Sequence, residues 1–140
     1  MVFQALGGIS MATSVGLGAY GAHGLASRLK ELEKAQIPPA STTASPQEVW
    51  SRANAYQQLH SLGLLLTPLL SEPHSKLRPL AGFSFASGIV LFSGGLYAAT
   101  WTGNRQLSSG APFGGVAFMI GWVALAVARR RPPSIPKPAL

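Results

Sequence analysis

The chain has 140 residues, of which 47% are hydrophobic and only 11% are charged, and its net charge is +7. Soluble domains carry about 25% charged residues, so this composition indicates a membrane protein. The absence of cysteine excludes disulfides, thiolate metal sites and a cysteine nucleophile. The sequence also lacks aspartate, and its four glutamates lie in predicted loops or at helix ends. We therefore expect that the protein is not an enzyme.

Four nearly charge-free stretches follow one another along the chain. Each is close to the length of about 20 residues that a membrane-spanning helix needs. They predict spans at about residues 2–25, 53–70, 79–101 and 111–128, separated by short loops and by one polar linker at 26–52. Short connections make consecutive helices antiparallel neighbours. The sequence therefore predicts an all-α fold, an integral membrane four-helix up-down bundle over residues 1–128, followed by a basic, proline-rich tail at 129–140.

Small residues recur in the spans at a spacing typical of packed membrane helices. In the first span one row consists of Gly8, Ala12 and Gly16, and a second row consists of Ser14, Gly18 and Ala22. Small residues four apart let two membrane helices approach backbone to backbone. We expect helix packing at Gly8, Ala12, Gly16, Gly18, Gly21, Gly88, Gly94, Gly95, Gly114 and Gly115. The alternative is a span that is merely rich in small residues.

The polar linker contains a helical charge pattern at residues 28–34 and a proline-containing stretch at residues 36–46. Ser45, Pro46 and Glu48 resemble the start of a helix, with proline in its first turn. The second span that follows is polar in its first half and apolar from Leu62.

Polar and ionisable side chains inside a membrane span are functional candidates because their burial in lipid is unfavourable. The candidates for proton or ligand handling are Tyr20, His23, Tyr56, Gln57 and His60. Tyr20 and His23 lie near the end of the first predicted helix, and the other three lie near the start of the second. In an antiparallel bundle, these two helix ends would lie towards the same membrane face. Two imidazoles can bind a ligand or relay a proton. The alternative is structural hydrogen bonding of both histidines. We expect no metal and no cofactor, because the spans supply no carboxylate as a third ligand.

The positive charge lies beside the apolar stretches, notably in the three arginines at 129–131. Basic residues in this position are typical of anchors to anionic lipid headgroups. No aromatic residues alternate with the basic run, so we do not expect a nucleic acid partner. The expected partners are membrane lipids and other membrane protein subunits.

Four segments together resemble a family of small membrane proteins, domain of unknown function 423, which includes transmembrane protein 256. The segments are GLGAYGAHG at 16–24, YQQLHSL at 56–62, GIVLFSGGLY at 88–97, and PFGG at 112–115 continuing to Gly121 and Trp122. The resemblance covers about residues 5–126. The chain departs from the family pattern at Ala111, where threonine is usual, and in its longer linker.

The resemblance implies a four-helix membrane fold without an assigned enzymatic activity, found in bacterial inner membranes and in mitochondria. The matching motif positions are His23, Tyr56, His60, Phe92, Ser93, Tyr97, Pro112, Gly114, Gly115 and Trp122. We expect a non-catalytic accessory or structural subunit of a larger complex, with a respiratory or energy-converting assembly of the mitochondrial inner membrane favoured. The alternative is a small transporter, channel or lipid- or ligand-binding protein that uses a polar cluster of His23 and His60.

Overall fold

The computed structural model describes residues 2–37 and 43–128. The elements assigned within these residues are helices, which confirms the predicted all-α class. They are α1 (Val2–His23), α2 (Leu25–Lys34), α3 (Pro46–Leu70), α4 (Leu77–Gly88), the π-helix η1 (Ile89–Gly94), α5 (Gly95–Thr102), the 3-10 helix η2 (Arg105–Ser108) and α6 (Ala111–Val127).

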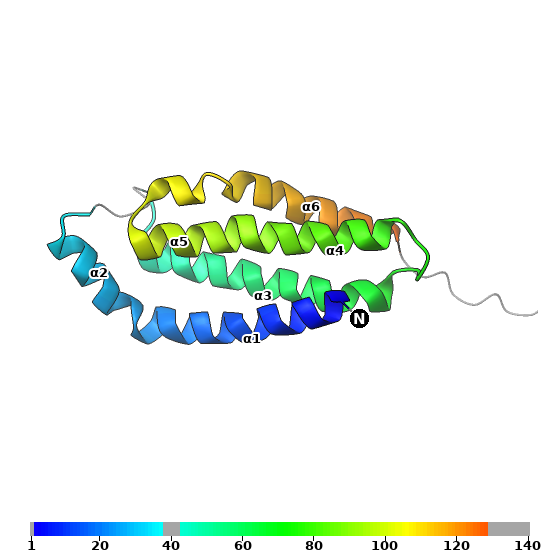
Figure 1. Cartoon of the computed structure of the whole chain (residues 1–140), viewed down its shortest axis with the longest axis horizontal. Coiled ribbons are helices and arrows are strands. Elements are labelled where there is room, and N and C mark those ends of the chain that lie inside the picture. Colours follow the sequence, from blue (N-terminus) through cyan, green and yellow to red (C-terminus); the bar gives the residue numbers. More distant parts are fainter. Residues whose placement is uncertain (1, 38–42, 129–140) are drawn as a thin grey trace, which may run out of the picture.

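The long helices lie lengthwise beside one another, and α4, η1 and α5 form one continuous rod (Figure 1). Helix α1 packs mainly against α3, and α4 packs mainly against α6. Helix α3 lies at the centre, in contact with α1, α4, η1, α5 and α6. Gln57 and His60, two of the candidate residues of α3, are therefore buried among the other helices.

Three helices in the described part of the chain are long and apolar enough to cross a membrane. They are Val2–His23, Leu77–Thr102 and Arg105–Val127. Helix α3 has sufficient length, with 25 residues, but its first half is polar. The second predicted span, 53–70, therefore stays a prediction, and so does the complete four-helix membrane bundle.

The linker predicted at 26–52 contains more helix than its composition suggests. Helix α1 ends at His23, not near residue 25, and after Gly24 the chain continues as α2. Helix α3 begins at Pro46, seven residues before the predicted span. Its start is a capping box, in which the Glu48 N–H donates to the Ser45 hydroxyl at 3.2 Å and the Ser45 N–H donates to the Glu48 carboxylate at 2.7 Å. The hydrogen bond from the Ser45 N–H to the carboxylate is the main cause that lowers the pKa of Glu48, and the Ser45 side chain adds to it.

The third predicted span, 79–101, corresponds to the α4–η1–α5 rod, which covers Leu77–Thr102. Gly94 and Gly95 both have φ −59° and ψ −45°, so the helix continues through this pair. The rod ends at Gly103, which has φ 74° and adopts the left-handed conformation that glycine tolerates at a helix end. The local irregularity is the π-helical turn Ile89–Gly94, which ends at the first of the two glycines.

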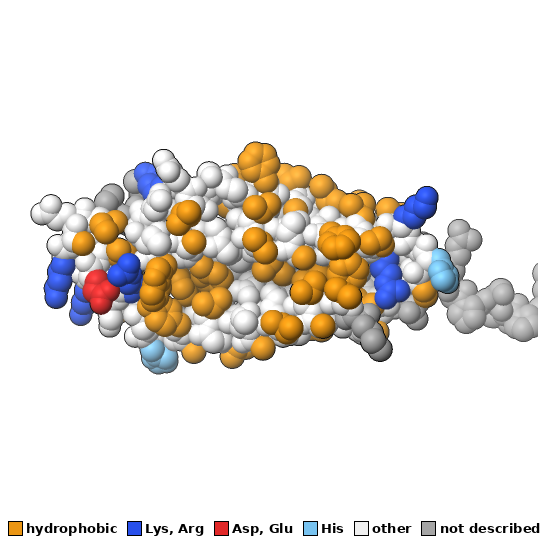
Figure 2. All heavy atoms as spheres, in the orientation of Figure 1, with side chains coloured by type: hydrophobic (Ala, Val, Ile, Leu, Met, Phe, Trp, Pro, Cys, Tyr) orange, Lys and Arg blue, Asp and Glu red, His pale blue; other side chains and the backbone are white. Residues whose placement is uncertain are grey.

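The core contains two clusters of buried hydrophobic residues. One joins α3, α4 and α6 and contains Leu64, Ala81, Phe85, Phe118, Ala124 and Leu125. The other lies near α2 and contains Leu25, Trp50, Ala53 and Tyr97. Hydrophobic side chains also cover the visible flank, whereas charged side chains gather at the two ends (Figure 2). An apolar flank between charged ends is the surface that a bilayer requires.

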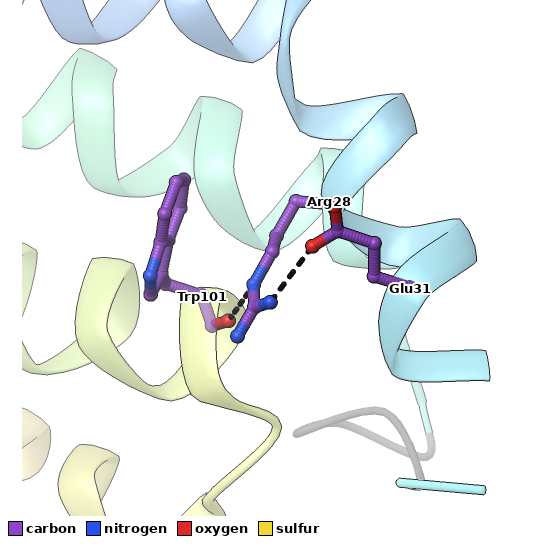
Figure 3. Close-up of polar contacts among 3 residues, drawn as sticks. All are labelled: Arg28, Glu31 and Trp101. Carbon is purple, nitrogen blue, oxygen red and sulfur yellow. Dashed lines mark hydrogen bonds and ion pairs between the residues drawn. The ribbon is translucent and has the colours of Figure 1, made fainter. Parts of the chain in front are cut away.

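Arg28 attaches α2 to the end of α5 (Figure 3). Its Nε donates to the Trp101 carbonyl at 3.0 Å, and its Nη1 lies 2.9 Å from the Glu31 carboxylate. The guanidinium carbon lies 5.3 Å from the centroid of the Trp101 ring. The last carbonyls of a helix lack intrahelical partners, so Arg28 satisfies one of them and fixes α2 against the bundle.

Candidate functional site

The main polar site is a seam of hydrogen bonds between α1 and α3. The Gln57 amide nitrogen donates to the Ser10 carbonyl at 3.0 Å and to the Thr13 hydroxyl at 3.1 Å. The Ser61 hydroxyl donates to the Ser10 hydroxyl at 2.6 Å. Each of these bonds joins two different helices, so the polar side chains of α3 hold α1 in place.

A second part of the seam connects α1, α3 and α5 through Asn54. Its amide nitrogen donates to the Ser14 carbonyl at 2.6 Å and to the Tyr97 hydroxyl at 3.1 Å. Its amide oxygen accepts from the Gln58 side chain at 3.0 Å. One helical turn earlier, the Trp50 indole donates to the Leu17 carbonyl at 2.8 Å. The polar first half of α3 thus interacts with neighbouring helices rather than with lipid.

Three buried polar atoms have no hydrogen-bond partner among the described residues. They are Gln57 Oε1, Ser93 Oγ and Thr100 Oγ1. A buried polar atom without a hydrogen bond is unfavourable in a low-dielectric interior. These three atoms are therefore available for a hydrogen bond to a small polar ligand.

His60 lies in an aromatic cage rather than in a polar cluster. Its ring stacks on Phe118 with 3.4 Å between ring centroids and an interplanar angle of 11°. Phe85 and Trp122 lie beside it, each with a centroid distance of 6.0 Å. Its Nδ1 lies 2.6 Å from the Tyr56 carbonyl, one turn earlier in α3. Donation from Nδ1–H to that carbonyl leaves Nε2 as the acceptor nitrogen.

The structure does not bring His23 and His60 together. The seam pairs Ser10 with Gln57, and the Ser61 carbonyl lies next to Gly7, so His60 is level with the first part of α1. His23 is the last residue of α1, 16 positions after Gly7, which corresponds to about 24 Å along the helix. The side chain of His23 is exposed. A site that uses both imidazoles therefore does not form within one chain.

The remaining candidate residues also lie apart. Tyr20 contacts Trp50 and Trp101, with centroid distances of 5.5 and 5.1 Å, near the α2 end. Tyr56 stacks on Phe92 at 4.5 Å and is 41% exposed. Tyr56 and His60 lie on one face of α3, with ring centroids 5.6 Å apart and both rings against Phe118, whereas Gln57 points towards α1. No group of three His, Asp or Glu side chains within the described residues is arranged to hold a metal ion.

The predicted packing positions divide into two groups when a Cβ atom is placed on each glycine. A Cβ on Gly114 would lie 2.6 Å from the Phe92 nitrogen, one on Gly88 would lie 3.0 Å from the Gly114 carbonyl oxygen, and one on Gly95 would lie 2.9 Å from the Leu107 carbonyl oxygen. Gly18 and Gly21 lie against Asn54 and Trp50. In contrast, a Cβ on Gly94 would meet only the Ile89 carbonyl oxygen, at 3.8 Å, and one on Gly8, Gly16 or Gly115 would meet nothing within 4 Å. Ala12, in the row of Gly8 and Gly16, is exposed.

Sequence reasoning missed several residues of the seam. The hydroxyl partners Ser10, Thr13 and Ser61 were not identified, and neither was the close contact at Gly7, where a Cβ would lie 2.8 Å from the Leu65 nitrogen. A signal was present, because Ser10, Thr13 and Ser14 are spaced three and four apart and so lie on one face of α1.

Comparison with known proteins supports the resemblance. The model of a family described as a protein of unknown function, domain of unknown function 423, matches residues 17–115. A UPF0382 membrane protein of Staphylococcus epidermidis is 39% identical over 127 residues, which cover 91% of this chain and 93% of the relative. The UPF0382 membrane protein YwdK of Bacillus subtilis is 38% identical over 129 residues, which cover 91% of this chain and 94% of the relative. No solved structure matches the chain.

These relatives leave one expectation without support and confirm another. They are bacterial proteins, so the comparisons give no support to the expected mitochondrial inner membrane or to a mitochondrial respiratory assembly. They are named membrane proteins, which agrees with the three membrane-length helices. The chain is thus a small integral membrane protein, and it belongs to the UPF0382 family, the proteins of unknown function that share domain of unknown function 423.

Proposed function

We propose that the protein is a non-catalytic subunit of a larger membrane assembly and that α1 is the helix that packs against its partner. The observation that carries this proposal is the burial of the three membrane-length helices. In each helix an apolar stretch of 18 residues is long enough to compare. Only 11% of that stretch is buried in Val2–His23, compared with 39% in Leu77–Thr102 and 33% in Arg105–Val127. Helix α1 therefore leaves most of its surface available to another protein.

The outward face of α1 has the composition that helix association in membranes favours. Gly8 and Gly16 face open space, and Ala12 between them is exposed. Ile9 and Val15 beside this row are also exposed. Lipid tails are as apolar as leucine, so membrane helices associate through close packing at small residues rather than through the hydrophobic effect. A partner helix could approach the backbone of α1 closely along this row.

The interior supports a structural role more than a chemical one. The seam side chains of α3 hold α1, and His60 stacks among aromatic rings. The glutamates occupy α2, the start of α3 and the loop after α3, away from the seam. The polar groups of the interior are thus used in packing helices together.

The test compares two changes of the same type at glycines that lack internal contacts. Gly16→Leu fills the outward face of α1, and Gly115→Leu adds the same side chain on α6, where it also meets nothing within 4 Å. Tagged chains are extracted from native membranes in a mild detergent and separated on native gels. The wild-type chain and Gly115→Leu are expected to migrate with a stoichiometric partner, whereas Gly16→Leu is expected to migrate alone. Migration of the wild-type chain only as a free small protein, or retention of the partner by Gly16→Leu, would contradict the proposal.

A second candidate function is a small transporter, channel or ligand-binding membrane protein. The unpartnered Gln57 and Ser93 side-chain oxygens favour it, because buried polar atoms without partners are suited to a polar guest. Flux of a small polar solute into vesicles containing the purified chain would distinguish this function. We would expect Gln57→Leu to abolish such flux while the helix content stays unchanged. Absence of flux with the wild-type chain would exclude the candidate for that solute.

A further inference from the structure

A hydrophobic groove with a volume of about 360 Å³ runs between α4 and α6. Leu77 and Leu80 line it from α4, and Met119, Val123 and Val127 line it from α6. Val123 and Val127 are each about two-thirds exposed, at 65% and 67%. The groove is therefore accessible from the side, where a membrane protein meets lipid.

The length of the groove matches one leaflet of a bilayer. From Met119 to Val127 the α6 backbone advances eight residues, which corresponds to about 12 Å. One leaflet provides half of the hydrocarbon core of about 30 Å, or about 15 Å. A transmembrane helix from a partner would extend far beyond such a short groove. An acyl chain that begins at the membrane surface would fit its length.

The outer end of the groove carries positive charge. Lys76 and Arg78 are the two sequence neighbours of Leu77, where α4 begins. Within the residues that the structure describes, neither basic side chain makes a hydrogen bond or an ion pair. Residues 71–78 contain one carboxylate, Glu72, so these two cations exceed it. Figure 2 shows basic side chains at this end of the molecule, close to the hydrophobic flank.

The side chains, rather than the helix backbone, would recognise a headgroup here. The Leu77 N–H donates to the Ser75 hydroxyl at 3.2 Å, and the Arg78 N–H donates to the Ser75 carbonyl at 3.1 Å. The next residue, Pro79, has no N–H. The first turn of α4 thus offers no free backbone donor, which leaves the Lys76 ammonium and the Arg78 guanidinium as the available donors.

From this juxtaposition we propose that the α4–α6 groove binds an anionic phospholipid. One acyl chain occupies the groove, and the phosphate and anionic headgroup lie against Lys76 and Arg78. The apolar lining selects a hydrocarbon chain, the groove length places its ester end at the membrane surface, and the charge selects an anionic headgroup over a zwitterionic one. This inference does not depend on the proposed packing of α1.

The first test measures headgroup selectivity. The full chain is reconstituted in vesicles of phosphatidylcholine with a minor fraction of phosphatidylglycerol, and the lipids retained after mild extraction are quantified by native mass spectrometry. We expect the wild-type chain to retain phosphatidylglycerol well above its bulk fraction. Each basic side chain near a membrane surface contributes about fivefold to the affinity for anionic lipid, so Lys76→Gln with Arg78→Gln should lower retention roughly 25-fold. Lys30→Gln with Lys34→Gln removes the same charge from the other end and should leave retention unchanged.

The second test separates the groove from general surface charge. Val123→Trp fills the groove and leaves both cations in place, so it should abolish the selective retention. Met119→Trp, also at an exposed lining position, provides a second variant if the first does not fold, as judged by circular dichroism. Val116→Trp adds the same ring to α6 outside the groove lining and should have no effect. Retention at the bulk ratio by the wild-type chain, selective retention that survives both groove variants, or a second copy of the chain displaced by Val123→Trp would overturn the proposal.

Discussion

The contact between Gly114 and the π-helical turn allows a test of helix packing at a single atom. A Cβ at Gly114 would lie 2.6 Å from the Phe92 backbone nitrogen and 3.1 Å from the Gly88 carbonyl oxygen. Both neighbours are backbone atoms, which cannot rotate away as a side chain does. The adjacent Gly115 meets nothing within 4 Å, so it offers a matched control in the same helix.

Two opposing effects determine how each substitution changes the free energy of unfolding. Replacing glycine by alanine inside a helix adds about 0.5–1 kcal/mol of stability, and this gain is shared by Gly114→Ala and Gly115→Ala. Overpacking a close contact costs about 1–3 kcal/mol, and only Gly114→Ala incurs it. The difference in unfolding free energy between the two variants therefore isolates the overpacking, and we expect Gly115→Ala to be more stable by about 1–3 kcal/mol.

The assay is reversible unfolding in mixed micelles with increasing denaturing detergent, monitored by circular dichroism. The wild-type chain should fall between the two variants, with Gly115→Ala above it. If Gly114→Ala were as stable as Gly115→Ala, the close approach of α6 to Phe92 would be absent or readily relaxed. The interpretation of Gly114 as a packing residue would then be wrong.

Three further predictions use the same measurement with other matched pairs. Gly7→Ala should be less stable than Gly8→Ala by about 1–3 kcal/mol, because only the Cβ at position 7 meets the Leu65 backbone. Tyr97→Phe removes the acceptor of the Asn54 amide and should cost about 0.6 kcal/mol, the average for such a bond in a membrane protein, while Tyr56→Phe should be neutral; equal effects would exclude the Asn54 bond as the cause. Ser45→Ala should cost about 1 kcal/mol at neutral pH through the lost cap, with Ser51→Ala as control. The pKa of Glu48 is lower in the folded state, first because its carboxylate accepts from the Ser45 N–H, so its contribution is present above the unfolded pKa and is lost as pH falls through the folded pKa. Glu48→Gln removes this carboxylate, so its deficit should be largest at neutral pH and shrink in acid, and a deficit independent of pH would contradict that linkage.

The fold class could be predicted because charge patterning is strong, but the details of packing could not. Four charge-poor stretches predicted the helical fold, and Ser45, Pro46 and Glu48 predicted the start of α3. The packing face of α1 was not predictable in the same way. Gly7 and Gly8 are both small and apolar, and a helix whose outer face meets lipid lacks the polar contrast that marks the exposed side of a soluble helix.

The candidate site shows the same division between residue types and their placement. Gln57 and His60 were identified because polar side chains are conspicuous in an apolar span. Their surroundings were not, because the span was predicted to begin at residue 53, which placed His60 near a membrane face. Helix α3 begins at Pro46, so His60 lies 14 residues, or about 21 Å, into it. The π turn Ile89–Gly94 also had no sequence signal, because its residues are uniformly apolar or small apart from Ser93.

The seam between α1 and α3 has a consequence for biosynthesis. Ser10 of α1 bonds to Gln57 and Ser61 of α3, which are translated 47 and 51 residues later. At about 5–20 residues per second, α1 waits roughly 3–10 seconds for this partner. During that interval its hydroxyl groups have only their own helix to bond, as Thr13 does with the Ser10 carbonyl. Until α3 emerges, temporary association with another membrane helix would stabilise such a nascent helix.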